Sequence, residues 1–113
     1  MAKDDKNRYL TKNSADSLKT LDKLAGIPLT FGSALKANRL AEEMSQSELG
    51  AKIGVSRQYI HQLETGNRNP SVEQAVRIAK VFGMPEDQFV ELALQVQVEK
   101  AGLQKAVVLK KVI

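Results

Sequence analysis

Apolar residues recur at helical spacing through residues 46–63, on either side of a short break. In each half two large aliphatic side chains stand three or four positions apart, so they share one face of a helix. These side chains are Leu49 and Ile53, then Ile60 and Leu63. The spacing predicts one helix over residues 46–53 and a second over residues 56–64, joined by a tight turn at Gly54 and Val55.

Serines and a glycine stand where such a pair of helices must begin and cross. Ser45 and Ser56 precede the two helices, and a hydroxyl there accepts from an otherwise unpaired backbone N–H. Glu48 follows Ser45 by three positions, which is the spacing of a capping box. Gly50 lies where the helices would cross, so we expect its missing side chain to let them approach closely.

Three further helices are predicted from the same periodicity. They cover residues 31–43, capped by Thr30, residues 72–82, capped by Ser71, and a last stretch from Pro85 to about residue 100. Core-facing side chains are expected at Phe31, Ala34, Leu35, Leu40, Met44, Val72, Ala75, Ile78, Ala79, Phe82, Phe89, Val90, Leu92 and Ala93.

The two ends of the chain differ from its centre. Residues 1–15 are polar and predict disorder, whereas residues 16–25 carry leucines at helical spacing and predict a short amphipathic helix. That helix either packs on the core of its own domain or docks another subunit. Residues 104–113 have a β-like composition, and an isolated strand is unstable. This segment is either a strand that pairs with a second subunit or another protein, or a frayed tail.

The net charge of +4 does not lie on the predicted helices. Residues 30–94 hold seven basic and eight acidic side chains, so the excess lies at the ends, +2 over residues 1–29 and +3 over residues 95–113. Affinity for nucleic acid would therefore depend on the local placement of charge, on helix N-termini and on the tails. The alternative is that the charge serves solubility alone.

Several classes of protein are disfavoured by what the chain does not contain. It has no cysteine and no apolar run long enough to span a bilayer, which predicts a cytoplasmic protein without disulfides or membrane contact. It has no nucleophile–base pair at useful spacing, no phosphate loop and no cluster of metal ligands. We therefore expect no catalytic residue, no metal and no cofactor.

The pattern resembles the helix-turn-helix of the Cro/CI-like phage-repressor family, also called the XRE family. The matching features are Leu49, Gly50, Ile53, Gly54, Val55, Ile60 and Leu63, followed by the loop ETGNRNPS at residues 64–71. The resemblance implies an all-α fold, a five-helix lambda-repressor-like DNA-binding domain over residues 30–98. Outside this domain, composition and leucine spacing predict a polar, partly disordered N-terminal extension with a short helix over residues 1–29 and a C-terminal tail over residues 99–113, which is the candidate dimerisation strand.

The resemblance also implies a function, a sequence-specific DNA-binding transcriptional regulator that acts as a repressor. Arg39 and Glu64 match a family ion pair between two helices. One recognition helix contacts only a few base pairs, so such proteins usually bind double-stranded DNA as homodimers. Two alternatives stay open: an antitoxin that covers a toxin partner and regulates its own operon, and a protein-interaction adaptor.

Side chains with several hydrogen-bonding groups share one face of the helix predicted over residues 56–64. With Arg57 at zero, His61 falls near 40°, Gln58 at about 100° and Gln62 near 140° around the helix. Base contacts are expected at these four residues and, from the resemblance, at Ser56. Phosphate contacts are expected at Gln46, Ser47, Tyr59, Thr65, Asn67 and Arg68. For His61, Asn67 and Arg68 the alternative is an ordinary solvated side chain.

Overall fold

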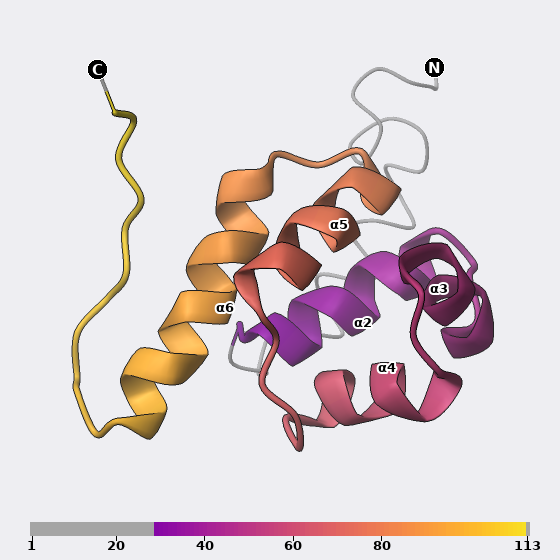
Figure 1. Ribbon diagram of the computed structural model, residues 1–113, viewed down its shortest axis with the longest axis horizontal. Helices are drawn as coiled ribbons and strands as arrows, with labels where there is room; N and C mark the ends of the chain where they lie inside the picture. The colour runs from indigo at the N-terminus through magenta and orange to yellow at the C-terminus, as the bar shows by residue number, and fades with distance from the viewer. Residues whose placement is uncertain (1–28, 113) are drawn as a thin grey trace.

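Five helices make up the part of the chain that the structure describes (Figure 1). The structure is a computed structural model that describes residues 29–112. Its helices are α2 (Phe31–Ala41), α3 (Gln46–Ile53), α4 (Arg57–Thr65), α5 (Val72–Phe82) and α6 (Glu86–Lys100). The predicted all-α, lambda-repressor-like fold is confirmed, and the helix expected at residues 16–25 lies outside the described residues. None of these helices is both long and apolar enough to cross a membrane.

Hydroxyl caps begin four of the five helices, as the sequence predicts. Each hydroxyl accepts from a backbone N–H in the first turn, which satisfies a donor that has no partner within the helix. The capping residues are Thr30 for α2, Ser45 for α3, Ser56 for α4 and Ser71 for α5. Before α6, Pro85 makes no such bond, and the acidic Glu86 and Asp87 instead face the positive end of the helix.

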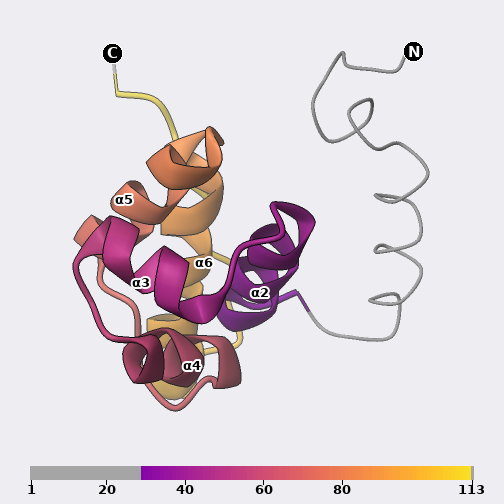
Figure 2. The ribbon, with the colours of Figure 1, turned by 90° about the vertical axis from the view of Figure 1, so that its right-hand side faces the viewer.

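The core lies between α2 and α4 on one side and α5 and α6 on the other, with α3 packed against both α4 and α5 (Figures 1 and 2). Phe31 of α2 meets Phe89 of α6 edge to face, with 5.8 Å between ring centroids. Aliphatic side chains fill the rest, namely Ala34, Leu35, Leu49, Ile53, Ile60, Leu63, Ala75, Ile78, Ala79 and Ala93. Both helices of the predicted pair thus contribute to one core.

Two residues expected in the core are on the surface. Leu40 is 54% exposed, because it lies opposite Phe31 on the helical wheel of α2, and the buried position next to it is taken by Arg39. Val72 is 40% exposed, because it is the first residue of α5, at the edge of the core. The prediction was wrong for both side chains.

α2 also ends two residues earlier than predicted, at Ala41. Glu43 adopts a left-handed backbone with φ 55°, an uncommon conformation for a residue other than glycine. The N–H of Met44 then bonds back to the carbonyl of Arg39 at 3.0 Å. This reversal brings the chain directly to the start of α3.

Two glycines allow helices to approach so closely that a methyl group would not fit. A Cβ on Gly50 would lie 2.5 Å from the carbonyl oxygen of Val55, in the turn between α3 and α4. A Cβ on Gly32 of α2 would lie 2.5 Å from the carbonyl oxygen of Glu64 at the end of α4. The sequence indicates the first of these contacts, and the second is found only in the structure.

Replacing Gly50 with leucine should therefore lower the free energy of unfolding by about 1–3 kcal/mol or more, because the added side chain must displace backbone. Chemical denaturation followed by circular dichroism measures this change. Ala51→Leu, on the exposed side of the same helix, is the matched control and should stay within about 0.5 kcal/mol. An unchanged unfolding midpoint for Gly50→Leu would contradict the close crossing.

Candidate nucleic-acid interface

The turn between α3 and α4 is fixed by backbone geometry. Gly54 ends α3 in the left-handed region, at φ 80°, where a side chain would be disfavoured. The N–H of Val55 then donates to the carbonyl of Gly50 at 2.8 Å. Ser56 begins α4, and its hydroxyl accepts from the N–H of Tyr59 at 3.0 Å. The N-terminus of α4 is thereby set at a defined angle to α3.

One face of α4 is polar and exposed, while the opposite face is buried in the core. Ile60 and Leu63 on the buried face are at most 1% exposed. The outer face presents Arg57, Gln58 and His61, all exposed, and the half-buried Gln62. The four side chains that the helical wheel predicts on one face do lie together on the outside of α4.

Gln46, at the start of α3, bridges to three side chains of α4. Its Nε2 donates to Glu64 Oε1 at 3.0 Å and lies 3.4 Å from His61 Nδ1. Its Oε1 accepts from Arg57 Nη1 at 3.3 Å. These contacts reach the first turn, the middle and the end of α4, so a single amide group ties the polar face of α4 to α3.

Arg39 and Glu64 form a buried ion pair behind this face. Arg39 Nε donates to Glu64 Oε2 at 2.6 Å and Nη2 donates to Oε1 at 3.1 Å, so the guanidinium grips both carboxylate oxygens. The two side chains are only 9% and 3% exposed. Arg39 Nη1 also donates to the carbonyl of Met44 at 2.8 Å. The pair therefore fixes the end of α4 to α2 and to the segment that leads into α3.

A second cluster supports the far end of the same face. Gln74 Nε2 donates to the Tyr59 hydroxyl at 2.6 Å, and the Arg68 guanidinium lies 4.3 Å from the centre of the Tyr59 ring. Arg68 Nε also donates to Gln62 Oε1 at 2.8 Å. Arg68 thus links the loop after α4 to one of the side chains on the outer face.

Known proteins are similar to this chain in sequence and in fold. A family model described as helix-turn-helix matches residues 35–89. An uncharacterised HTH-type transcriptional regulator of Methanocaldococcus jannaschii is 44% identical over 57 residues, which is 50% of this chain and 86% of that protein. The chain belongs to the XRE-type helix-turn-helix family.

Two other similarities fit this family. Control protein C.BamHI of Bacillus amyloliquefaciens is 36% identical over 63 residues, which is 54% of this chain and 78% of that protein. The crystal structure of the P22 c2 repressor, solved in complex with a synthetic operator, superposes with a TM-score of 0.51 at 26% identity. That match covers 55% of this chain and 94% of the repressor chain.

The residues singled out from the sequence fall at three places on the helix-turn-helix. Gln46 and Ser47 lie at the N-terminus of α3, where backbone N–H groups and the helix dipole favour an anion. The five candidate base contacts, Ser56, Arg57, Gln58, His61 and Gln62, follow the outer side of α4. Beyond its C-terminal end lie the exposed Asn67 and Arg68, with Thr65 on the last turn. Tyr59 differs from the others, because its ring is half-buried and its hydroxyl is bonded to Gln74.

Two residues of this helix-turn-helix have roles that the sequence analysis missed. Gln46 is more than a candidate phosphate contact, because it is the link between α3 and α4. Gln74 is buried and joins α5 to Tyr59. In both cases the partner residues lie on another helix, at least 11 positions away, so helical periodicity within one element does not reveal the contact.

Replacing Arg39 with alanine should lower the free energy of unfolding by about 3–5 kcal/mol, because Glu64 would be left charged and buried without its partner. Denaturant unfolding measures the loss. Arg77→Ala, at an exposed site of α5, is the control and should cost about 0.5 kcal/mol or less. The double variant Arg39→Met with Glu64→Leu should recover most of the loss, because no unpaired charge remains. A loss for Arg39→Ala no larger than the control's would contradict a buried pair.

Glu48 should titrate below the ordinary range of a glutamate. The backbone N–H of Ser45 donates to Glu48 Oε1 at 2.7 Å and lowers the pKa of this carboxyl, with smaller contributions from the Ser45 hydroxyl and Lys52. Since the folded pKa is depressed, this stabilisation is present above the unfolded pKa and is lost as the pH falls through the folded one. An NMR titration of the Glu48 carboxyl should give a lowered midpoint that Ser45→Ala raises. An ordinary midpoint would contradict the capping box.

Proposed function

We propose that this protein is a sequence-specific DNA-binding transcriptional regulator, acting as a repressor, that places α4 in the major groove of double-stranded DNA. The observation that carries the proposal is the exposed polar face of α4, held rigidly from behind by a buried ion pair. An α-helix fits the major groove, where each base pair presents a distinct set of donors and acceptors. A helix face that carries several donors and is held in a fixed orientation is suited to distinguish one base pair from another.

Base contacts are proposed for the residues along the outer side of α4. The Arg57 guanidinium can donate both to O6 and to N7 of guanine, and the amides of Gln58 and Gln62 can pair with adenine. Ser56 and His61 can each add a further hydrogen bond to the DNA. Within residues 29–112 the Arg57 side chain is held by a single 3.3 Å bond to Gln46 at an exposed site, so turning it towards a base costs little.

Phosphate contacts are proposed on both sides of these residues. Gln46 and Ser47 would bind one phosphate at the N-terminus of α3. On the other side, the phosphates of the DNA backbone would be contacted by Tyr59, Thr65, Asn67 and Arg68. Such contacts fix the register of the helix on DNA and carry little sequence information themselves.

The relatives support this proposal, because they are transcriptional regulators by name and the P22 c2 repressor was solved on an operator. An adaptor would not need the multi-donor face of α4, so DNA binding accounts for more of the described surface. Residues 30–98 would form the DNA-binding unit. Because α4 has nine residues and spans only a few base pairs, we also propose that two copies bind together as a homodimer.

Arg57→Ala should weaken binding to the cognate site by about 1–3 kcal/mol while leaving the free energy of unfolding unchanged, because the side chain is exposed. The cognate site is first obtained by selection from random DNA with the purified protein, and affinity is then measured at fixed salt.

Lys80→Ala is the matched control for the Arg57 variant. Lys80 is an exposed basic residue in the last turn of α5, and Figure 1 shows the C-terminal end of α5 pointing away from α4, so its loss should leave specific affinity unchanged. Equal affinity of Arg57→Ala and the unaltered protein for the selected site would overturn the assignment of α4. Failure to select any sequence would overturn specific DNA binding.

A further inference from the structure

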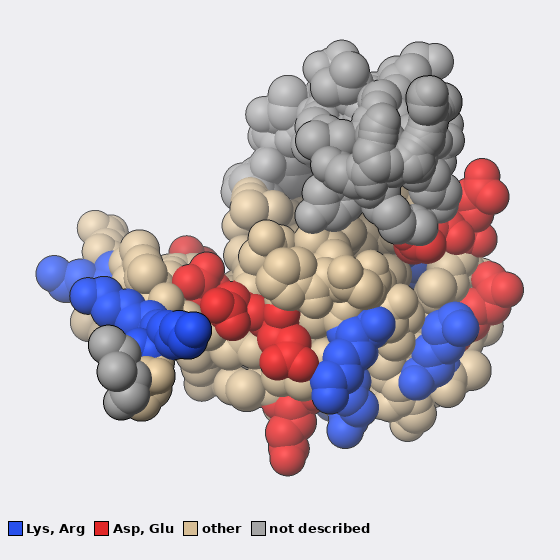
Figure 3. Space-filling model, turned by 90° about the horizontal axis from the view of Figure 1, so that it is seen from above, with Lys and Arg blue, Asp and Glu red and all other residues tan. Residues whose placement is uncertain are grey.

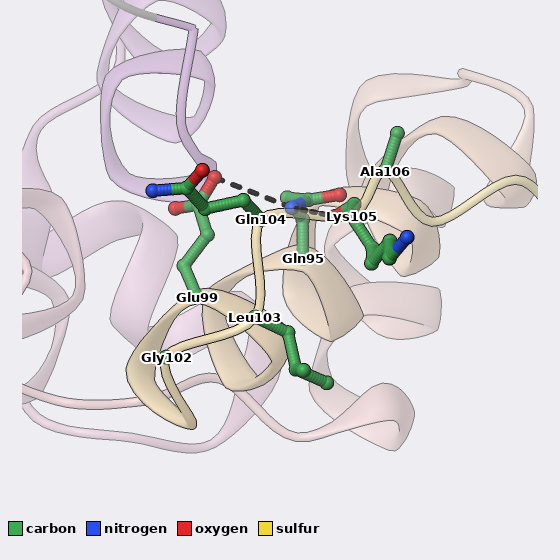
Figure 4. A pocket seen from close by; sticks show the side chains of 7 residues that line it. All are labelled: Gln95, Glu99, Gly102, Leu103, Gln104, Lys105 and Ala106. Carbon is green, nitrogen blue, oxygen red and sulfur yellow. Dashed lines mark hydrogen bonds between the residues drawn. The ribbon is translucent and has the colours of Figure 1, made fainter.

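The C-terminal tail, residues 103–112, is extended and held against α6 by helix side chains rather than by another strand (Figure 1). The N–H of Val107 donates to Gln95 Oε1 at 2.7 Å, and the N–H of Leu109 donates to Glu91 Oε2 at 2.9 Å. Gln95 Nε2 donates to the carbonyl of Lys105 at 2.9 Å (Figure 4). Two side chains of α6 therefore fix the tail at alternate residues.

This alternation leaves the other edge of the tail open. In an extended chain the N–H and C=O groups of successive residues point to opposite edges. Since residues 105, 107 and 109 face α6, the backbone groups of residues 106, 108 and 110 face outward, and they bond to nothing else within residues 29–112. Such an edge is a template for pairing with another strand.

Apolar side chains accompany this open edge. Val108 is 68% exposed and Val112 is 91% exposed. On α6 itself Phe89 faces the core, while Leu94 and Val98 lie well round the helix from it and are only half-buried. The tail and α6 together thus present an apolar surface that the described chain does not fully cover.

The charges of this surface are balanced between helix and tail. α6 carries four acidic residues and one lysine, whereas the tail carries three lysines and no acid. In Figure 3 basic side chains gather at the left-hand end of the molecule, where the tail lies, and acidic ones lie next to them. Together α6 and the tail carry no net charge, so two copies of this surface can meet without net repulsion.

We propose that a second copy of this chain occupies the open edge, with the two tails paired as antiparallel strands about a two-fold axis at Val107. The inference rests on the proposed function, since it supplies the interface of the proposed homodimer. Like charges directly opposite each other are destabilising in a strand pair. Pairing about Val107 places Lys105, Lys110 and Lys111 opposite Leu109, Gln104 and Leu103 of the other copy. Pairing about Val108 would instead oppose Lys105 to Lys111.

The same register brings opposite charges together. Lys110 and Lys111 of one copy would come opposite Gln104 and Leu103 of the other. Glu99 lines a shallow pocket with these two residues (Figure 4). Because successive side chains of an extended segment point to opposite faces, one lysine of each pair would lie beside Glu99 of the other copy, at both ends of the paired strands.

Single cysteines test this register cleanly, because the protein has none of its own. In the proposed pair the two Val107 residues face each other with Cα atoms about 4.5 Å apart, within the range a disulfide spans. The two Val108 residues would be about 8 Å apart, which is too far. After mild oxidation of the full-length protein, Val107→Cys should run as a covalent dimer, and Val108→Cys, its matched control, should remain monomeric on a denaturing gel.

A charge exchange supplies a second test, read by sedimentation without DNA. Glu99→Lys should raise the dissociation constant of the dimer about threefold or more, and adding Lys111→Glu should restore it. Glu86→Lys makes the same charge change at the other end of α6 and should leave dimerisation unaltered. If Glu99→Lys leaves the dissociation constant of the dimer unchanged, the proposed register is wrong.

Three results would overturn the proposal: a monomeric protein at micromolar concentration, a dimer that Val107→Cys does not cross-link, or equal cross-linking of Val107→Cys and Val108→Cys. These measurements do not depend on DNA. A monomer that still binds its selected site through Arg57 would refute the pairing of the tails and leave the DNA-binding proposal standing.

Discussion

The buried pair of Arg39 and Glu64 is the interaction on which the geometry of the helix-turn-helix depends. Its three guanidinium bonds join α2, the chain just before α3 and the end of α4. Desolvating two charges is unfavourable unless their hydrogen bonds are well made, so the pair tolerates little displacement of any of these elements. Glu64 Oε1 also accepts from Gln46, which extends the constraint to the outer face. Rigidity behind α4 is thereby transmitted to the side chains proposed to contact bases.

Two glycines, which carry no side chain, make this ion pair possible. Gly32 lets α2 approach the last turn of α4, and Gly50 lets α3 approach the turn that precedes α4. With a methyl group at either position the backbones would have to separate, and the short bonds of Arg39 and Gln46 could not all be kept. Close packing and the polar network are thus not independent, because the glycines set the distance at which the hydrogen bonds form.

Local chemistry explains what the sequence predicts well. α3 and α5 begin and end where their serine caps and glycine stops indicate, because those features act within one turn of helix. α2 ends early because Glu43 takes a left-handed conformation that only its surroundings can impose. Gln46 and Gln74 bond to residues on other helices, at least 11 positions away, and no periodicity within one helix contains that information.

The tail is a second case in which the sequence predicts a local conformation but not the contact that it makes. Its β-like composition favours an extended segment, and the tail is extended, but it forms no strand within residues 29–112. Composition does not say what an extended segment lies against. Here the answer comes from two side chains of α6, Glu91 and Gln95, which bond to the backbone of the tail as a neighbouring strand would. A helix side chain can satisfy only one edge, because alternate backbone groups point away from it. An extended segment with one satisfied edge is already held in the conformation that pairing requires, so pairing with a second segment would cost less conformational entropy.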